Sequence, residues 1–364
     1  MQDDFTCGFI GLGLIGGSIA RAMRLHHPAC RMMAYDINKD ALELAAREGV
    51  IDLPLSSISK EFGDCDYIFL CAPVSENDNN LVQLKKYISP RCLLTDAGSV
   101  KGDIHRHIEE AGLGGQFIGG HPMAGSERTG YINSKALLLE NAYYILTPCE
   151  GIPGNTIAAF RELVASLGAL PLVLDYSRHD YITAAISHLP HVIASSLVNL
   201  IKNSDEEDGL MKLIAAGGFK DITRIASSSP VMWQQICLTN GSNISRLLDD
   251  YIQSLNQIRE SIHMARAEEL YQFFNDARDY RDSFIDASSG PIKKSFSIRI
   301  DIADEPGALA AIATILALHQ ISIKNIGIVH NREQTDGVLA VEFYQEESIK
   351  KASEILQSKG YAIH

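Results

Sequence analysis

Short apolar runs alternate with helical patterns along the first 150 residues of the chain. The helical patterns between the runs include Ile15–Leu25, Lys39–Glu48 and Asn79–Ile88. Runs that are apolar throughout, rather than at every second residue, are typical of parallel strands covered on both faces. The pattern therefore predicts an α/β fold with a doubly wound parallel sheet. The expected strands are Cys7–Ile10, Arg31–Tyr35, Tyr67–Cys71, Leu93–Thr95, Phe117–Ile118 and Tyr143–Leu146.

The pattern then changes and stays helical from Tyr181 almost to Phe284. The next segment, DASSGPIKK, consists mainly of small residues and contains Gly-Pro, which is typical of a linker. Beyond it, the order strand, helix, strand, strand, helix, strand predicts a ferredoxin-like (βαββαβ) unit. We therefore expect a Rossmann-like domain over 1–175, an all-helical domain over 176–285, a linker over 286–294 and a βαββαβ domain over 295–364.

Composition and charge narrow the class of protein. Hydrophobic residues make up 46% of the chain and charged residues 21%, as in ordinary globular proteins. The net charge of −13 makes nucleic acid a poor partner. We find neither an apolar run long enough to span a bilayer nor a signal peptide, so we expect no membrane association and a cytoplasmic location. Seven widely spaced cysteines without a CxxC pair are expected to be buried thiols.

A glycine-rich turn follows the first apolar run and opens an alanine-rich helix. Its sequence GLGLIG has the GxGxxG spacing that lets a backbone approach the pyrophosphate of a dinucleotide at a helix N-terminus. Asp36 ends the second strand and favours NAD over NADP, because a carboxylate accepts the ribose hydroxyls and repels a 2′-phosphate. Arg31 and Lys39 leave NADP open as an alternative. The expected cofactor-binding residues are Gly11, Leu12, Gly13, Leu14, Ile15, Gly16, Asp36, Ala72 and Pro73.

Two segments at the carboxyl edge of the expected sheet have residues suited to catalysis. In FIGGHP (117–122), His121 follows a strand, two glycines precede it and a proline comes next, which is a poor place for a core histidine. A histidine there can accept the proton of an alcohol during oxidation, although a structural loop histidine is the alternative. In TDAGSVK (95–101), Ser99 can hold the same alcohol or the nicotinamide, or simply cap a helix.

The helix that begins near His179 has a polar stripe on an otherwise apolar surface. Asp180, Thr183, Ser187 and His191 fall on one narrow face, with His188 beside them. Such a stripe is expected to line a cavity or a wet interface, and Pro190 is expected to kink the helix. Two histidines three residues apart could also bind a metal, but the spacing offers no third ligand, so we expect no metal.

A second polar cluster lies in GGFKDITRI (217–225). Lys220 and Arg224 are four residues apart and are expected to share a helix face, where they could bind an anion. A surface ion pair of Asp221 with Arg224 is the alternative. Trp233, the single tryptophan, is expected to belong to the core.

These motifs occur together in an order that resembles one known family. GLGLIGGS, YDIN, TDAGSVKG, GGHPMAGSE, HDYITAAISHLPH, GGFKDITRIA and PVMW, covering residues 7–285, resemble the prephenate dehydrogenases of the tyrosine pathway. The C-terminal unit resembles an ACT regulatory domain, with DEPGAL (304–309) at the position of its ligand loop.

The resemblance implies an NAD-dependent oxidative decarboxylation of prephenate to 4-hydroxyphenylpyruvate by a homodimer. His121 would be the base for the substrate hydroxyl, with Ser99 assisting. Arg224 would bind a substrate carboxylate. Glu127 and Asp221 would form an ionic gate beside it. The implied substrate-binding residues are Arg224, Lys220, His188, His191, Ser126 and Glu127.

The ACT resemblance implies feedback by an amino acid, with tyrosine as the expected effector and Gly307 and Asn325 as expected contacts. A unit that only dimerises is the alternative. Three other functions remain open: arogenate dehydrogenase, which shares the chemistry; a β-hydroxyacid dehydrogenase, which would lack the GGHP histidine and SHLPH; and a non-catalytic sensor of NAD and amino acids, which would not need a base.

Overall fold

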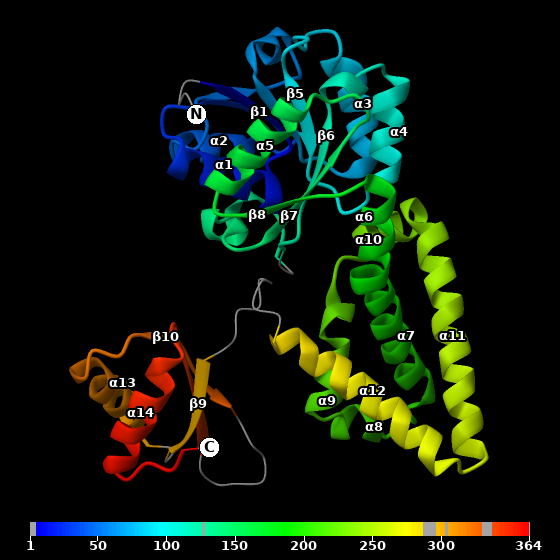
Figure 1. Cartoon of the computed structure of the whole chain (residues 1–364). Helices are drawn as coiled ribbons and strands as arrows, with labels where there is room; N and C mark the ends of the chain where they lie inside the picture. Colours follow the sequence, from blue (N-terminus) through cyan, green and yellow to red (C-terminus); the bar gives the residue numbers. More distant parts are fainter. Residues whose placement is uncertain (1–4, 126–127, 287–295, 303–304, 330–336, 364) are drawn as a thin grey trace. The chain divides into compact units, whose positions relative to one another are not determined.

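The computed structural model describes residues 5–125, 128–286, 296–302, 305–329 and 337–363, and Figure 1 shows the chain. The chain divides into two units, one up to Glu260 and one from Ser261 onward. The expected linker over 286–294 lies outside the described residues except for Asp286. The expected domain limits remain predictions, and each unit is described separately below.

The first unit begins with a five-stranded parallel sheet in the order β3-β2-β1-β4-β5. The strand order reverses between β1 and β4, and this is where open α/β sheets bind their ligands. The Rossmann-like parallel sheet expected from the apolar runs is confirmed, although the three-residue β3 was too short to be recognised. The strands are β1 (Thr6–Ile10), β2 (Arg31–Tyr35), β3 (Leu53–Leu55), β4 (Tyr67–Leu70) and β5 (Leu93–Asp96).

A second sheet adjoins β5 through a parallel bridge between Leu94 and Phe117. It consists of β6 (Ile118–Pro122), β7 (Tyr143–Pro148) and β8 (Leu170–Val173) in the order β6-β7-β8. The β6 and β7 strands are antiparallel, so β7 departs from the wholly parallel sheet that we expected. Because β6 runs parallel to β5, its carboxyl end lies at the same edge as those of β1, β4 and β5.

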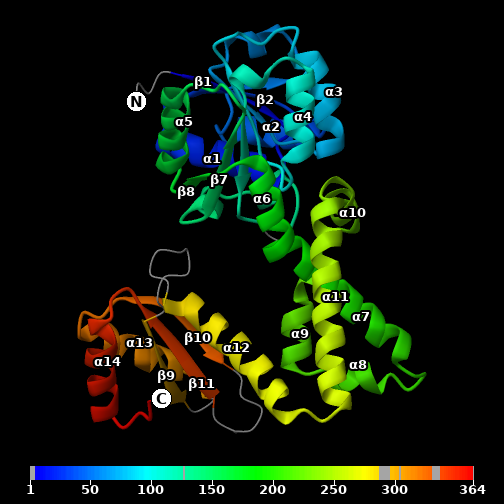
Figure 2. The ribbon, with the colours of Figure 1, turned by 45° about the vertical axis from the view of Figure 1, so that its right-hand side comes forward.

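Helices cover both faces of the sheet. In Figures 1 and 2, α3 and α4 lie side by side on one face, while α1 and α2 lie on the other. Burial of Phe9, Phe69, Phe117 and Phe160 between these layers stabilises the domain by removing apolar surface from water. The helices are α1 (Leu14–His26), α2 (Lys39–Arg47), α3 (Val74–Leu84), α4 (Gly102–Glu110) and α5 (Gly154–Ser166).

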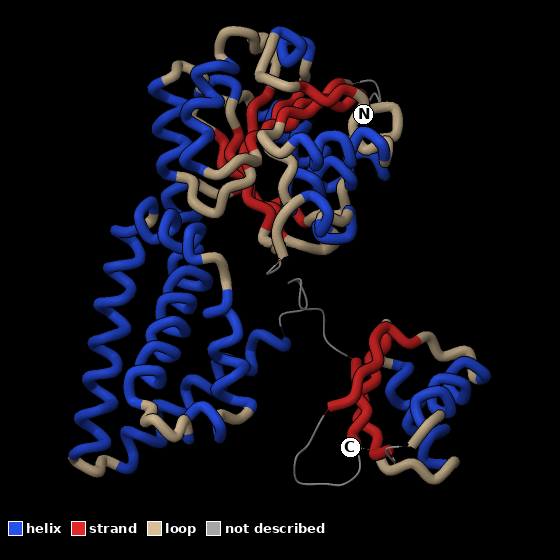
Figure 3. The backbone as a smooth tube through the Cα atoms, turned by 180° about the vertical axis from the view of Figure 1, so that it is seen from behind, coloured by secondary structure: helices blue, strands red, loops and turns tan. Residues whose placement is uncertain are grey.

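All regular structure from α6 to α12 is helical in the described residues, as expected from the sequence (Figure 3). The kink expected at Pro190 takes the form of a π-helical turn over Ala184–His188. Proline has no N–H for the preceding turn, which explains why the helical hydrogen bonding changes there. The helices are α6 (Tyr176–Thr183), α7 (Leu189–Ser204), α8 (Leu210–Ile214), α9 (Gly217–Thr223), α10 (Pro230–Thr239), α11 (Gly241–His263) and α12 (Ala267–Asp286).

The helical stretch Tyr176–Ser204 has the length and mean hydropathy of a membrane span. Only 17% of the 18-residue window with this hydropathy is buried in the chain. The expectation that no segment is long and apolar enough to span a bilayer is therefore wrong on length and hydropathy. Asp180 and His188 lie buried within the same stretch, where they contact other parts of this chain.

The second unit ends in a three-stranded antiparallel sheet in the order β10-β11-β9. A bridge from Ile363 to Ile300 extends the sheet beyond β9. Ile300, Ile312, Val341 and Leu356 form the core between the sheet and two helices. The elements are β9 (Phe296–Ile302), α13 (Ala308–Leu318), β10 (Ile323–Val329), β11 (Gly337–Phe343) and α14 (Glu347–Ser358).

Candidate active site

The glycine-rich turn between β1 and α1 is packed against the segment that follows β4. Gly11 has φ +98°, and a Cβ there would lie 2.5 Å from the Ala72 backbone nitrogen. A Cβ on Gly16 would lie 2.3 Å from the Gly11 carbonyl oxygen. These two glycines therefore let the strand, the turn and the helix meet at the switch point of the sheet.

Gly13 serves a different purpose. Its φ of −79° and ψ of −155° suit any residue, and a Cβ there would meet nothing within 4 Å. The space in front of Gly13 is thus open, directly before the N-terminus of α1. An open cradle beside unpaired helical N–H groups fits the pyrophosphate of a dinucleotide.

Asp36 follows β2 and holds the glycine-rich turn. Its Oδ2 accepts the Leu12 N–H at 2.6 Å, and its Oδ1 accepts the Asn38 N–H at 2.7 Å. Arg31 stands at the opposite end of β2 from Asp36, five residues or roughly 16 Å away along a strand. Lys39, the exposed first residue of α2, is the cation that remains nearby.

Ala72 and Pro73 lie where β4 leads into α3. The Ala72 carbonyl accepts a hydrogen bond from Asn77 Nδ2 at 3.3 Å, and Pro73 is the residue before the first turn of α3. Ala72 lies next to Gly11, at the point between β1 and β4 where the strand order reverses. The cofactor-binding role of Ala72 and Pro73 stays a prediction.

His121 is the fourth residue of β6 and is half-buried. Its Nδ1 lies 2.8 Å from Nε2 of His179, and Nδ1 of His179 lies 2.8 Å from Oδ1 of Asp180. The three side chains form a hydrogen-bonded row that joins the sheet to α6. The sequence did not suggest the contact between His121 and His179, which are 58 residues apart.

Asp180 is fixed at the start of α4. Its Oδ1 accepts the Lys101 N–H and its Oδ2 accepts the Gly102 N–H, both at 2.8 Å. These are N–H groups that α4 cannot satisfy itself, and the helix dipole favours a negative charge there. Asp180 therefore caps α4 from another helix and keeps the row in place.

Lys101 and Asp96 form a fully buried ion pair below His121. Lys101 Nζ donates to Asp96 and to the Gly120 carbonyl at 2.8 Å, and the Gly120 N–H donates to Asp96 Oδ1 at 3.1 Å. Both backbone groups of the residue before His121 are thus held by this pair. A buried lysine needs such partners, because an unpaired charge in the interior is strongly unfavourable.

The surroundings of His121 disfavour its charged form. Burial lowers the pKa of His121 well below 6.5, and the charges of His179, Lys101 and His188 lower it further. The ring is therefore neutral at physiological pH and has a lone pair available for a proton. A neutral histidine at the carboxyl edge of a nucleotide-binding sheet is suited to general-base chemistry.

Ser99 lies in the loop between β5 and α4, at the same edge of the sheet, and is half-buried. Among the described residues, no hydrogen bond joins its hydroxyl to the His121 ring. Its predicted contact with substrate or nicotinamide stays a prediction.

The two histidines near Pro190 differ in their surroundings. His188 is buried, and its Nδ1 lies 3.1 Å from Asn240 Nδ2, which also donates to the Asp180 carbonyl at 2.8 Å. Burial is the main cause that lowers the pKa of His188 to about 4. The π-helical turn rotates the chain, so His188, and not Ser187 as we expected, continues the buried polar side of Asp180 and Thr183.

His191 is half-buried and stacks on Trp233, with ring centroids 3.7 Å apart. Its Nδ1 lies 3.0 Å from the Ser187 carbonyl, so Nε2 is the free nitrogen of the neutral ring. Trp233 packs against the small core cluster of Val100, Ala184, Ile236 and Ile244, which agrees with its expected place in the core.

Arg224 and Lys220 do not continue one regular helix. Lys220 lies in α9, which ends at Thr223, and Arg224 begins a 3-10 turn, so the shared face expected from the spacing is altered. Burial lowers the pKa of His191, and the charge of Arg224 lowers it further. The 3-10 turn that begins at Arg224 packs against α7, which contains His191. Both cations are exposed in the single chain.

The remaining expected residues are distributed as follows. Ser126 and Glu127 lie outside the described residues. Gly307, with φ +97°, precedes α13, and Asn325 is an exposed residue of β10 whose Oδ1 accepts the Ile326 N–H at 2.9 Å. In the described part of the chain, no group of three or more His, Cys, Asp or Glu side chains could hold a metal ion.

Comparison with known families covers most of the chain. Residues 19–172 match the family model described as "Prephenate dehydrogenase, nucleotide-binding domain", and residues 175–276 match "Prephenate dehydrogenase, dimerization domain". A prephenate dehydrogenase of Bacillus subtilis (strain 168) is 36% identical over 96% of this chain and 95% of its own length. The chain belongs to the prephenate dehydrogenase family. By family and by its nucleotide-binding fold it is an NAD-dependent dehydrogenase.

Other members of the prephenate dehydrogenase family agree with this assignment. A Lactococcus lactis prephenate dehydrogenase is 33% identical over 96% of both chains. The crystal structure of A. aeolicus prephenate dehydrogenase in complex with hydroxyphenyl propionate and NAD+ has a TM-score of 0.73 at 31% identity, covering 77% of this chain and 98% of its own. Synechocystis arogenate dehydrogenase has a TM-score of 0.69 at 29% identity, covering 77% and 99%.

Four polar residues of the site had no predicted role: His179, Asp96 and Lys101 near His121, and Asn240 beside Asp180 and His188. Asp96 and Lys101 lie in the motif TDAGSVKG, and His179 opens the motif HDYITAAISHLPH and the polar stripe. These motifs did not show that Lys101 is buried, which is rare for lysine, or that His179 contacts His121.

Proposed function

We propose that this chain catalyses the NAD-dependent oxidative decarboxylation of prephenate to 4-hydroxyphenylpyruvate. The observation that carries the proposal is the neutral, half-buried His121 at the carboxyl edge of a dinucleotide-binding sheet. The family supports prephenate as the substrate, since relatives with that name match nearly the full length of the chain.

The chemistry needs a base, an anion site and a hydride acceptor. His121 accepts the proton of the ring hydroxyl as the hydride leaves the same carbon. The glycine-rich turn and Asp36 would hold NAD, which supplies the hydride acceptor when it is bound. The ring carboxylate then leaves as carbon dioxide, its bonding electrons complete the aromatic ring, and the proton returns to the phenol oxygen. The balance is prephenate and NAD+ to 4-hydroxyphenylpyruvate, carbon dioxide and NADH.

Arg224 is the proposed partner of a substrate carboxylate. A guanidinium can bind a carboxylate with two parallel hydrogen bonds, and this acidic chain needs local positive charge to bind a dianion. Its proximity to His191 supports a pocket that extends from His121 past His188 and His191. Lys220, Ser99, Ser126 and Glu127 complete the proposed set, with Glu127 and Asp221 as an ionic gate.

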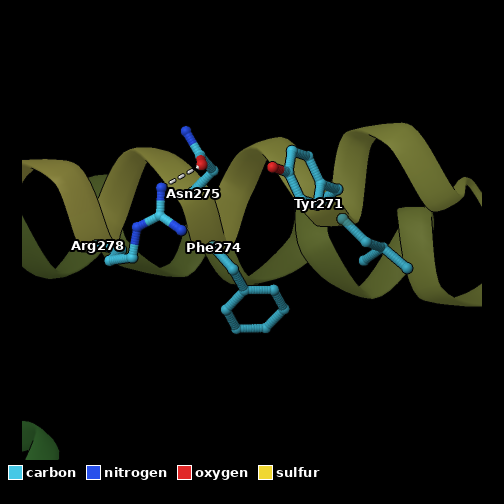
Figure 4. A pocket seen from close by; sticks show the side chains of 5 residues that line it. Tyr271, Phe274, Asn275 and Arg278 are labelled. Atoms are coloured by element: carbon cyan, nitrogen blue, oxygen red, sulfur yellow. Dashed lines mark hydrogen bonds between the residues drawn. The ribbon is translucent and has the colours of Figure 1, made fainter.

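We propose a cytoplasmic homodimer formed through the helical domain. In a single chain, Leu200, Leu213, Ile214 and Leu238 of the first unit are each at least 60% exposed, an unusual amount of apolar surface for a monomer. In the second unit, α12 presents Tyr271 and Phe274 beside a shallow pocket, with Arg278 bonded to Asn275 (Figure 4). A second copy, rather than lipid, would cover the apolar side of residues 176–204. The description of the matching family model as a dimerization domain supports this assembly.

The C-terminal sheet and helices are proposed to form an ACT regulatory domain that binds tyrosine. The chain order β9, α13, β10, β11, α14 and the bridge at Ile363 support the ferredoxin-like pattern. Gly307 is the proposed site where the backbone approaches the effector, because φ +97° is a conformation that favours glycine. Asn325 is the proposed polar contact.

Product analysis tests the proposed reaction. Purified protein incubated with prephenate and NAD should form 4-hydroxyphenylpyruvate, carbon dioxide and NADH in equal amounts. Arogenate in a parallel incubation tests the alternative substrate, which is supported by the similarity to an arogenate dehydrogenase. NAD binding without turnover of either substrate would contradict the proposal and support a non-catalytic sensor.

A further inference from the structure

The hydrogen bonds around Asp180 determine where the protons of the histidine row lie. An ionised carboxylate only accepts hydrogen bonds, and Asp180 faces two backbone N–H groups and Nδ1 of His179. Nδ1 of His179 must therefore be protonated. In the neutral ring its Nε2 then has a lone pair, 2.8 Å from Nδ1 of His121. His121 Nδ1 is thus the donor to His179, and Nε2 of His121 is left without a proton.

This row is held rigidly by residues outside it. His179 is completely buried, and Asp180 is 5% exposed. The Thr183 hydroxyl donates to the His179 carbonyl at 3.0 Å, and Asn240 Nδ2 donates to the Asp180 carbonyl at 2.8 Å. Hydrogen bonds hold the backbone carbonyls of His179 and Asp180 and the Asp180 carboxylate. Because the side chains are also buried, the row keeps one arrangement of protons.

We propose that His179 and Asp180 are positioning residues that keep the proton of neutral His121 on Nδ1 and leave Nε2 free to accept the substrate proton. The inference rests on the proposed function of His121 as the base. Without His179, the His121 ring can place its proton on Nε2, and that tautomer cannot accept a proton from the substrate.

Asp180 is the member of this row that can offset the positive charge that forms on His121 during the reaction. When His121 takes the substrate proton, its positive ring faces Lys101 from the loop before α4, His188 from the π-helical turn and His179 from α6. Asp96 of β5 pairs with Lys101, so Asp180 is the carboxylate linked to His121, through His179. Asp180→Asn is therefore expected to weaken His121 as a base.

Three variants of the full-length chain test the proposal, once wild-type turnover of prephenate has been measured. His179→Leu removes the acceptor and should lower kcat roughly 10²-fold, with KM for prephenate and NAD within about threefold of wild type. His179→Gln keeps an oxygen that can accept from His121 and should recover most of the lost kcat. His26→Leu, the same change at the exposed end of α1, should leave kcat unchanged.

A spectroscopic measurement distinguishes positioning from a merely structural role. Nitrogen chemical shifts of ¹⁵N-labelled histidine, with the His121 signals assigned by their absence in His121→Asn, report which ring nitrogen has the proton. We expect Nδ1 in the wild type and in His179→Gln, and a shift of the proton toward Nε2 in His179→Leu. An unchanged tautomer together with an unchanged kcat in His179→Leu would overturn the inference. A wild type that turns over no substrate would instead refute the proposed function, while the shifts would still test the row.

Discussion

His121 is an example of a residue whose chemistry is determined by its neighbours. Burial and three nearby cationic or titratable groups keep its ring neutral, and the buried Asp96–Lys101 pair holds the backbone just before it. Such a pair rarely adds stability, because desolvation offsets the attraction between the charges. Here the pair fixes the backbone of Gly120, and the charge of Lys101 lowers the pKa of His121.

The low pKa of His121 predicts the pH dependence of the reaction. Only the neutral ring can accept a proton, so activity is lost as the pH falls through the pKa of His121. Because that pKa lies well below 6.5, kcat/KM for prephenate should be constant from about pH 8 down to about pH 6 and fall only below that range. A decline centred near the ordinary value for histidine would contradict the environment described for this ring.

His121→Asn provides the control for this profile. It should lower kcat by roughly 10²–10⁴-fold with little change in NAD affinity, and the residual rate should lose the acidic limb. Isothermal titration with NAD checks that the cofactor site is intact.

Arg224→Ala tests the anion site. Loss of the guanidinium should raise KM for prephenate roughly tenfold or more and leave KM for NAD nearly unchanged, because only the substrate would lose a charged hydrogen-bonding partner. Arg161→Ala, on the exposed side of α5, is the matched control. Equal KM values for prephenate in the two variants would move the carboxylate site elsewhere.

At the scale of elements, the sequence predicted those features that depend only on residues close together in the chain. The glycine-rich turn, the existence of a strand near residue 118 and the break at Pro190 were recognisable from a few adjacent residues. The strand is longer than expected and includes His121, which we placed after it. The pairing of His121 with His179 was not, since it depends on how α6 packs against the sheet. The π-helical turn was missed for a related reason: a proline predicts a disturbed helix, but not that the residues before it form a π-helical turn and bury His188.

The glycine-rich turn allows a prediction that separates ligand binding from folding. Gly13→Ala adds a methyl group that meets no protein atom within 4 Å, so the melting temperature should barely change. The methyl group would occupy the space proposed for the pyrophosphate, so Kd for NAD should rise roughly tenfold or more. Gly115→Ala, where a Cβ also meets nothing within 4 Å, is the control. Unchanged NAD affinity in Gly13→Ala would place the cofactor elsewhere.

At the scale of the whole molecule, the proposed regulation must link two parts that have separate hydrophobic cores. The C-terminal sheet has its own core of eleven buried residues, distinct from the nucleotide-binding domain. An effector bound there can act only if it favours one of two arrangements of the assembly, since equal affinity for both would shift nothing.

Removal of residues 290–364, which include the proposed ACT domain, tests the proposed regulation. A chain ending at Ser289 should keep prephenate turnover and lose any inhibition by tyrosine that the full-length protein shows. Rates measured over a series of tyrosine concentrations, in both proteins, check this. If millimolar tyrosine does not change the rate of the full-length protein, tyrosine is not the effector. A Kd of 1 mM corresponds to a binding free energy of roughly −4 kcal/mol.

The most direct test of the central claim is the initial rate of NADH or NADPH formation by the full-length protein with four combinations of substrate and cofactor. We predict the highest kcat/KM for prephenate with NAD. Relatives named prephenate dehydrogenase match nearly the full chain, and the carboxylate of Asp36 disfavours the 2′-phosphate of NADP. Turnover of arogenate but not prephenate would contradict the assigned substrate and leave the chemistry of His121 in place. Turnover of neither would contradict the account as a whole.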